Sequence, residues 1–176
     1  MTVRRAVILG ILAVVMDGAV VAEERFRPHE PLPPGARVDR VLVLKAGRRL
    51  ILLKDGAQLK AYRIALGGNP IGHKTRQGDS RTPEGVYTID YRNPRSAYHR
   101  SLHISYPNAA DRAAAKAAGV SPGGDIMIHG IRNGMGWLGD QHRRVDWTDG
   151  CIAVTNPEIE EIWRAVADGT PIEIRP

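Results

Sequence analysis

Short apolar runs separated by glycine-containing turns constrain the fold of this chain more than any other feature. The two runs and the extended segment that follows them are residues 41–44, 50–53 and 58–66. Ala46-Gly47 and Asp55-Gly56 lie between them, and these residues favour the tight turns that join antiparallel strands. Each run is apolar on both faces, which indicates strands that are covered on both sides. The folded part of the chain is therefore expected to begin as a β-sheet.

More strands and two short helices are expected further along the chain. The additional strands are predicted at residues 86–89, 102–106, 126–128, 152–155 and 171–176. An alanine-rich helix is expected over 108–119, with Asn108 as its cap and Gly119 as its stop. A second helix is expected over 156–169, with Asn156 as its cap and Pro157 in the first turn. The predicted fold class is mostly β, with two short helices.

The N-terminal segment has the three parts of a secretory signal peptide. Two arginines precede an apolar run at residues 6–16, and small residues follow at Val20 and Ala22. Cleavage is expected after Ala22, with export of the rest of the chain. The run is shorter than the ~20 residues that span a bilayer, but Asp17 is unusual in a signal peptide. Residues 1–22 are therefore predicted to be a signal peptide or, alternatively, an uncleaved anchor.

A proline-rich linker is expected between this leader and a single folded domain. The sequence RPHEPLPPGAR is typical of a stiff linker, so residues 23–37 are assigned to the linker and 38–176 to the domain. The formal net charge is +6, and it falls to +5 when Arg4, Arg5 and Asp17 leave with the leader. This charge suits an anionic partner such as a cell-wall polymer or a membrane surface. A nucleic-acid partner is not expected, because no basic run is interleaved with aromatic residues.

Cys151 is the only cysteine of the chain, so it has no partner for an internal disulfide. In an exported protein it is a buried filler, an intermolecular bridge or a reactive thiol. His129 ends one predicted strand and Cys151 precedes the next, so the two meet if these strands are neighbours. A histidine beside a cysteine takes its proton and stabilises the thiolate. Gly150 lacks a Cβ, so backbone N–H groups of its turn can converge on the oxygen of a tetrahedral intermediate.

These residues resemble the catalytic domain of the L,D-transpeptidase family. The resemblance rests on His129-Gly130 followed by Thr148-Asp149-Gly150-Cys151, and on GDSRTPEGVYTI at residues 78–89. It covers most of residues 38–176 and implies a β-sandwich or barrel-like sheet. It also implies that Cys151 is the nucleophile and His129 its base. The Gly130 carbonyl would orient the histidine, and Gly150 with the Cys151 N–H would form the oxyanion site.

The chain departs from the family pattern at two positions near the thiol. Asp149 stands where many members have histidine, and a carboxylate beside the thiol disfavours the thiolate unless it turns outward. Ala153 stands where many members have arginine or asparagine, which removes a group that could steer a substrate carboxylate. Loop residues could replace it, although such charges are more often solvated than bound to substrate. The candidate substrate-binding residues are Arg132, Arg143, Thr148 and Asp149.

The resemblance implies a periplasmic acyltransferase that acts on peptidoglycan stem peptides without a cofactor or a metal. Cys151 would attack the carbonyl of the third stem residue, expel D-alanine and leave a thioester that an amine resolves. The departures also resemble a branch whose members cut lipoprotein from the wall, so an outer-membrane lipoprotein partner and hydrolysis by water stay open. An inactive wall-binding module and a zinc peptidase that uses His129, His142 and Cys151 stay open as well. The spacing of those three residues matches no compact zinc motif.

Overall fold

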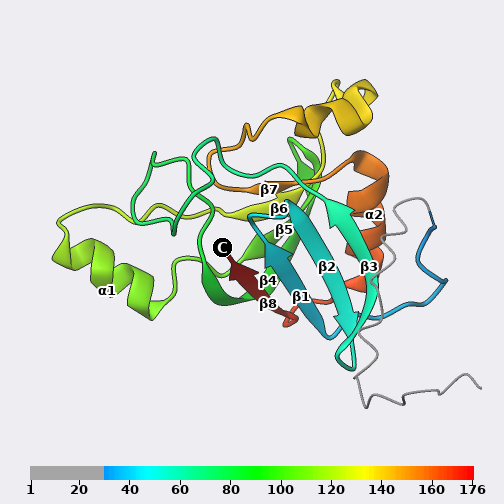
Figure 1. The fold of residues 1–176 in the computed structure, drawn as a ribbon, viewed down its shortest axis with the longest axis horizontal. Coiled ribbons are helices and arrows are strands. Elements are labelled where there is room, and N and C mark those ends of the chain that lie inside the picture. Colours follow the sequence, from blue (N-terminus) through cyan, green and yellow to red (C-terminus); the bar gives the residue numbers. More distant parts are fainter. Residues whose placement is uncertain (1–29) are drawn as a thin grey trace, which may run out of the picture.

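The structure is a computed structural model that describes residues 30–176. Within this part of the chain, eight strands form one hydrogen-bonded sheet in the order β3-β2-β1-β8-β4-β5-β6-β7 (Figure 1). This sheet confirms the mostly β fold class. The predicted leader at 1–22 and the first part of the predicted linker lie outside the described residues.

The first three strands follow the predicted pattern of runs and turns. They are β1 (Arg40–Leu44), β2 (Arg49–Lys54) and β3 (Ala57–Arg63), each antiparallel to the next. Asp55 and Gly56 both have positive φ, at 51° and 78°, which is the backbone that a two-residue hairpin turn requires. The third strand ends at Arg63, three residues earlier than the predicted segment.

The last strand lies in the middle of the sheet. Strand β8 (Pro171–Arg175) runs parallel to β1 on one side and antiparallel to β4 (Gly85–Ser96) on the other. Strand β4 is much longer than the predicted 86–89. The sequence gives no signal for the extension, because most side chains beyond Ile89 are exposed and carry no apolar alternation. Its second part pairs with β5 (His99–Ile104), which carries the sheet onward.

Two short strands complete the sheet and bring the predicted catalytic residues into the same region. Strand β6 (Met127–His129) pairs antiparallel with β5, and β7 (Ile152–Ala153) pairs parallel with β6. His129 is opposite Ala153 in this register, and Ile128 is opposite Ile152. The strand that carries His129 and the strand that follows Cys151 are therefore neighbours.

The described part of the chain contains three helices, one more than predicted. Helix α1 (Ala109–Ala117) begins at the predicted cap Asn108, whose side chain accepts hydrogen bonds from the amides of Ala110 and Asp111. The third helix, η1 (Gly136–Arg144), is a 3₁₀ helix with a break at Gly139. Its sequence has no apolar periodicity, so the sequence predicts only a loop there. Among residues 30–176, no helix is long and apolar enough to cross a membrane.

The predicted cap of helix α2 (Asn156–Ala165) is wrong by one residue. Thr155 is the cap, and the Glu158 carboxylate accepts a hydrogen bond of 2.8 Å from the Thr155 amide in a capping box. Asn156 has a different task, because its Oδ1 accepts a hydrogen bond of 2.8 Å from the amide of Ile131. That bond ties the loop after β6 to the start of α2.

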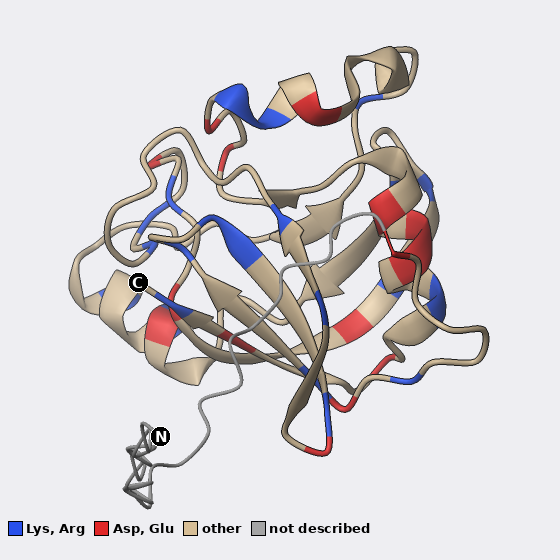
Figure 2. Ribbon diagram, turned by 45° about the vertical axis from the view of Figure 1, so that its right-hand side comes forward, with Lys and Arg blue, Asp and Glu red and all other residues tan. Residues whose placement is uncertain are grey.

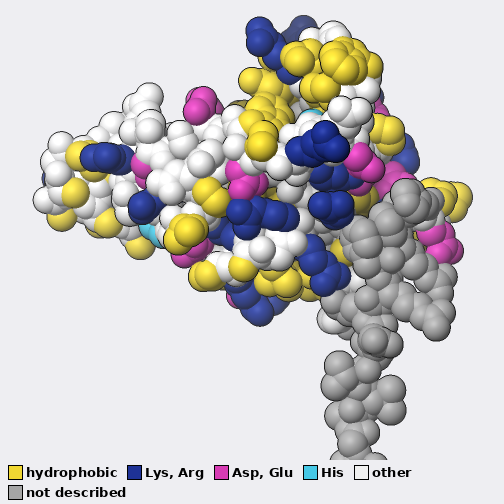
Figure 3. Space-filling view, turned by 45° about the horizontal axis from the view of Figure 1, so that its top comes forward, with side chains coloured by type: hydrophobic (Ala, Val, Ile, Leu, Met, Phe, Trp, Pro, Cys, Tyr) yellow, Lys and Arg dark blue, Asp and Glu magenta, His cyan; other side chains and the backbone are white. Residues whose placement is uncertain are grey.

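The core lies between the sheet and α2. Ile159 and Ile162 on α2 are fully buried, as are Leu102 and Ile104 on β5. Helix α1 lies at the other end of the molecule, away from α2 (Figure 1). Charged residues are spread over helices, loops and strands (Figure 2). Hydrophobic side chains beside Lys and Arg gather over the region of η1 (Figure 3), where Trp137 is 76% exposed.

Candidate active site

Cys151 and His129 line one open pocket of about 390 Å³, which we call the thiol pocket. The pocket is formed by the β4–β5 hairpin, β6 and the turn before β7. Its lining residues are Asn93, Ser96, Ala97, Tyr98, Ser101, Asp125, Met127, His129, Trp147, Thr148, Asp149 and Cys151. The structure therefore brings together the thiol and the imidazole that the sequence pattern pairs.

His129 is held in one orientation by its own backbone neighbour. Its Nδ1 lies 2.7 Å from the carbonyl oxygen of Gly130, which is the contact predicted for Gly130. A carbonyl only accepts hydrogen bonds, so Nδ1 carries the proton and the neutral ring keeps a lone pair on Nε2. The ring packs against Tyr98 at 4.6 Å and Trp147 at 5.8 Å between centroids. The side chain is buried, and this burial lowers the pKa of His129.

The thiol of Cys151 sits in surroundings that favour its protonated form. Sγ lies 3.5 Å from the carbonyl oxygen of Asp125, to which the thiol can donate. Burial raises the pKa of Cys151, and the nearby charges of Asp149 and Asp125 raise it further, while the Met127 amide acts against them. The pKa of His129 is lowered at the same time. The resting pair is therefore a thiol beside a neutral imidazole, and the expected effect of Asp149 on the thiolate is present.

The turn before β7 is fixed by the Thr148 hydroxyl. Oγ1 donates to the Cys151 carbonyl at 2.7 Å and accepts from the Gly150 amide at 3.2 Å. The Gly150 N–H is thus engaged inside the turn, which leaves the Cys151 N–H as the candidate oxyanion donor. Gly150 has φ +129°, and a Cβ there would lie 2.5 Å from the carbonyl oxygen of Arg81. Glycine is therefore required both by the backbone angle and by the close approach of Arg81.

The two candidate arginines do not line the thiol pocket. Arg132 is an exposed loop residue. The side chain of Arg143 is only 8% exposed and forms an ion pair of 3.0 Å with Glu158 and another with Asp140. Both carboxylates neutralise Arg143 and hold it against α2 and η1. Thr148 and Asp149 do line the pocket, Thr148 as the organiser of the turn and Asp149 as an exposed carboxylate.

The charged side chains that line the thiol pocket are acidic. Asp125 and Asp149 contribute carboxylates, and no Lys or Arg is among the lining residues. His142, the third residue of the zinc hypothesis, is buried against Trp147, whose Nε1 lies 3.4 Å from its Nδ1. Among residues 30–176, no group of three or more His, Cys, Asp or Glu side chains is arranged to hold a metal ion.

Most residues that line this pocket are not among the predicted site residues, and three of them, Trp147, Asp125 and Tyr98, lie near the thiol or the imidazole. Trp147 precedes the Thr148–Cys151 turn directly, so its place in sequence is a usable signal. Asp125 has a positive φ of 54°, which an aspartate tolerates, but nothing in the sequence ties it to the thiol. Tyr98 reaches His129 only because the β4–β5 hairpin folds over the end of β6.

Comparison with known proteins agrees with this geometry. The family described as the L,D-transpeptidase catalytic domain (YkuD) matches residues 38–174. The chain belongs to this L,D-transpeptidase family. A curated member from Escherichia coli (strain K12), named "Putative L,D-transpeptidase YafK", is 33% identical over 132 residues, which are 72% of this chain.

Solved structures of other proteins share the fold. The helical cell shape determining protein Pgp2 from Campylobacter jejuni is 28% identical with a TM-score of 0.59 over 80% of this chain. An L,D-transpeptidase from Xylanimonas cellulosilytica matches with a TM-score of 0.54 at 14% identity over 84% of this chain and 65% of its own, which shows the fold alone. The chain spans about half the length of the YafK and Pgp2 relatives, 46% and 48% respectively.

Proposed function

We propose that this protein is a peptidoglycan L,D-transpeptidase that transfers an acyl group through a thioester on Cys151. The observation that carries the proposal is the shared pocket of Cys151 and His129, in which the Gly130 carbonyl fixes the imidazole with Nε2 available as a base. Membership of the L,D-transpeptidase family supplies the substrate class, which is the tetrapeptide stem of peptidoglycan.

Acylation would proceed from the neutral pair. Nε2 of His129 takes the thiol proton as Sγ attacks the carbonyl carbon of the third stem residue. The developing oxyanion is within the reach of the Cys151 N–H, in the role that preorganised backbone donors play in acyl transfer. When the tetrahedral intermediate collapses, the bond to the terminal D-alanine breaks and the imidazolium returns its proton to the leaving amine. The product is a thioester on Cys151 and free D-alanine.

An amine would then resolve the thioester. The ammonium group first gives a proton to Nε2 of His129, which passes it to solvent, and the neutral amine then attacks the thioester carbonyl. When the tetrahedral intermediate collapses, the nitrogen gives a second proton to His129, the Cys151 sulfur leaves as a thiolate, and the imidazolium returns that proton to the sulfur. The acidic lining of the thiol pocket favours this acceptor over water, because an amine is mostly protonated in solution and is attracted by Asp125 and Asp149. Water gains nothing from two carboxylates. The carboxylate at position 149 thus slows thiolate formation but recruits the acceptor.

The setting of this reaction is proposed as the periplasm, because the family acts on peptidoglycan and the first 22 residues are predicted to be a leader. The Campylobacter relative is described as a determinant of helical cell shape, so a part in shaping the cell wall is proposed for this chain as well. Cleavage of a lipoprotein from the wall is the outcome to test against transfer, since both begin with the same thioester.

The decisive experiment incubates purified protein with defined disaccharide tetrapeptides and identifies the products by mass. Transfer predicts release of D-alanine together with a cross-linked dimer. A hydrolase would release D-alanine and leave only the shortened tripeptide stem. Retention of all D-alanine by the wild-type protein, with Cys151 shown to be reduced, would contradict the proposed function altogether.

A further inference from the structure

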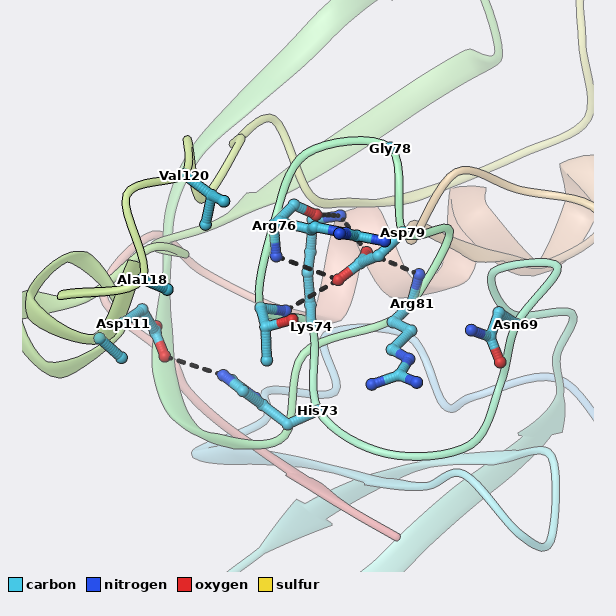
Figure 4. A pocket seen from close by; sticks show the side chains of 12 residues that line it. Asn69, His73, Lys74, Arg76, Gly78, Asp79, Arg81, Asp111, Ala118 and Val120 are labelled. Carbon is cyan, nitrogen blue, oxygen red and sulfur yellow. Dashed lines mark hydrogen bonds and ion pairs between the residues drawn. The ribbon is translucent and has the colours of Figure 1, made fainter. Parts of the chain in front are cut away.

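A second and larger cavity lies next to the turn that carries Cys151. It has a volume of about 640 Å³ and lies between the loop of residues 69–81 and helix α1 (Figure 4). We call it the arginine pocket; its charged and titratable lining residues are His73, Lys74, Arg76, Asp79, Arg81 and Asp111. The proposed mechanism uses none of them.

The two carboxylates of the arginine pocket are already satisfied. Asp79 accepts from Lys74 Nζ at 2.8 Å and from the amides of Thr75, Arg76 and Arg81. Burial alone would raise its pKa, but Lys74 and these amides outweigh it and bring the pKa of Asp79 to about 2. Asp111 accepts from Tyr87 Oη at 3.1 Å and from the Asn108 amide at 2.9 Å, and it contacts His73 Nε2 at 3.1 Å.

The guanidinium groups of Arg76 and Arg81 have no hydrogen-bond or ion-pair partner among residues 30–176. Arg76 is exposed, so water solvates it. Arg81 is half-buried, and its Nε is enclosed without any partner in the described part of the chain. Its guanidinium extends into the cavity between His73 and Asn69 (Figure 4). The terminal N–H groups of this guanidinium can therefore donate to an acceptor that enters the cavity.

We propose that the arginine pocket binds a carboxylate of the peptidoglycan stem, away from the bond that is cut. The planar fork of an arginine matches the two oxygens of a carboxylate, and Arg76 adds a second positive charge at the rim. This inference rests on the proposed function, because stem peptides carry carboxylates remote from the scissile bond. A phosphate presents similar oxygens and is the competing source of such an anion.

The backbone of the arginine pocket contacts the turn of residues 148–151, which carries Cys151. The Arg81 carbonyl is the atom that a side chain at position 150 would strike, at 2.5 Å. The Gly68 amide also donates to the Thr148 carbonyl at 2.9 Å, and the Asn69 amide donates to the Ser80 carbonyl at 3.0 Å. A stem held by the Arg81 side chain is therefore anchored to the same backbone that positions Cys151.

The test measures binding of a disaccharide tetrapeptide to the Cys151→Ala protein by calorimetry, so that no turnover interferes. Adding Arg81→Gln should weaken binding about tenfold, because it removes a charge-assisted hydrogen bond. Arg81→Lys keeps the charge without the fork and should lie in between. Arg112→Gln, on the adjacent helix but outside the pocket lining, is the matched control and should leave the affinity unchanged.

A change in the ligand tests the same contact from the other side. The tetrapeptide with its remote carboxylates converted to carboxamides should bind about tenfold more weakly, and Arg81→Gln should then cause no further loss. In the active protein, Arg81→Gln should raise KM with kcat nearly unchanged. Equal affinities for both ligands, or an unchanged KM, would overturn the pocket assignment while D-alanine release would still support the thiol chemistry. Inorganic phosphate that binds with an Arg81-dependent affinity but does not compete with the stem would also overturn it.

Discussion

The thiol pocket and the arginine pocket lie beside the same turn, but their charges have opposite signs. Carboxylates of Asp125 and Asp149 line the first, and the second is lined by Arg76 and Arg81, whose guanidiniums have no partner within residues 30–176. A net charge of +6 for the whole chain conceals this separation. The difference fits the two proposals made above, in which one pocket attracts the amine of an acceptor and the other binds a carboxylate of the stem. Variants that change the charge of one pocket at a time can therefore test the two proposed binding roles separately.

The largest effect is expected from removing the thiol. Cys151→Ala should abolish D-alanine release and any covalent adduct, because Cys151 is the only cysteine of the chain and a hydroxyl is a far weaker nucleophile than a thiol. Cys151→Ser keeps nearly the same volume and should fold with a modest loss of stability, yet lose nearly all turnover. Mass spectrometry of the acyl-enzyme and thermal melting of both variants measure this. D-alanine release by Cys151→Ala at the wild-type rate would assign the chemistry elsewhere.

Removing the imidazole should have the next largest effect. His129→Ala should slow acylation by roughly 10²- to 10⁴-fold, the usual contribution of a positioned general base. Binding of the stem to the arginine pocket should persist, because His129 does not line it. Single-turnover acylation together with calorimetry separates the two effects. A parallel loss of stem affinity would show that the two pockets are not independent binding regions.

A methyl group on the shared turn should disturb both pockets at once. Gly150→Ala places a Cβ against the Arg81 carbonyl at a backbone angle that favours glycine, so kcat/KM should fall about 100-fold through misplacement of the thiol. Stem affinity should fall as well, since the Arg81 backbone must move. Gly169→Ala is the control, because Gly169 also has a positive φ of 89° but has open space around its Cβ. Equal kinetics for the two variants would mean that the Arg81 contact does not couple the pockets.

The smallest effect is expected from neutralising one carboxylate of the thiol pocket. Asp149 raises the pKa of Cys151, so Asp149→Asn should lower that pKa and increase alkylation by iodoacetamide at neutral pH about threefold to tenfold. At high pH both thiols are fully ionised, so the two alkylation rates should converge. Asp55→Asn, in a distant turn, serves as the control.

The same variant should weaken the amine acceptor. Asp149→Asn should raise KM for the acceptor amine by a similar factor while leaving stem binding intact. The pH dependence of the alkylation rate measures the pKa of Cys151, and steady-state kinetics with varied amine measure the KM for the acceptor. An acceptor KM that does not change would remove the argument for transfer over hydrolysis.

Local patterns predict the elements whose cause is local. Runs and turns predict β1 to β3, and the Asn108 cap predicts α1, because neighbouring residues determine both. The cap of α2 is encoded locally too: Thr155 and Glu158 are spaced as a capping box, but Asn156 is an equally good capping residue and misled the prediction. Helix η1 has no periodic apolar face and so leaves no signal.

The site is predictable only where strand ends determine it. His129 and Cys151 flank short apolar strands, so adjacency of those strands is enough to pair them. The ion pairing of Arg143 depends on Glu158, which lies on α2, and no spacing rule relates the two residues. Asp125, Tyr98 and the arginine pocket likewise depend on how loops fold over the sheet. These contacts are tertiary, so the sequence carries no periodic trace of them.

The central position of β8 in the sheet affects how the chain can fold during its synthesis. The strand between β1 and β4 is made after the other seven, so during synthesis β1 and β4 have no strand between them until residues 171–175 have left the ribosome. Until then, only the backbone bridges of Ala65 to Ala153 and of Gly67 to Thr148 can join the two halves of the sheet. Closure must then pair segments that are far apart in the sequence, which costs loop-closure entropy and makes folding slow. A nascent chain of this kind lacks the strand at the centre of its sheet while the other seven strands already exist, which suits the proposed export through a translocation channel before folding is complete.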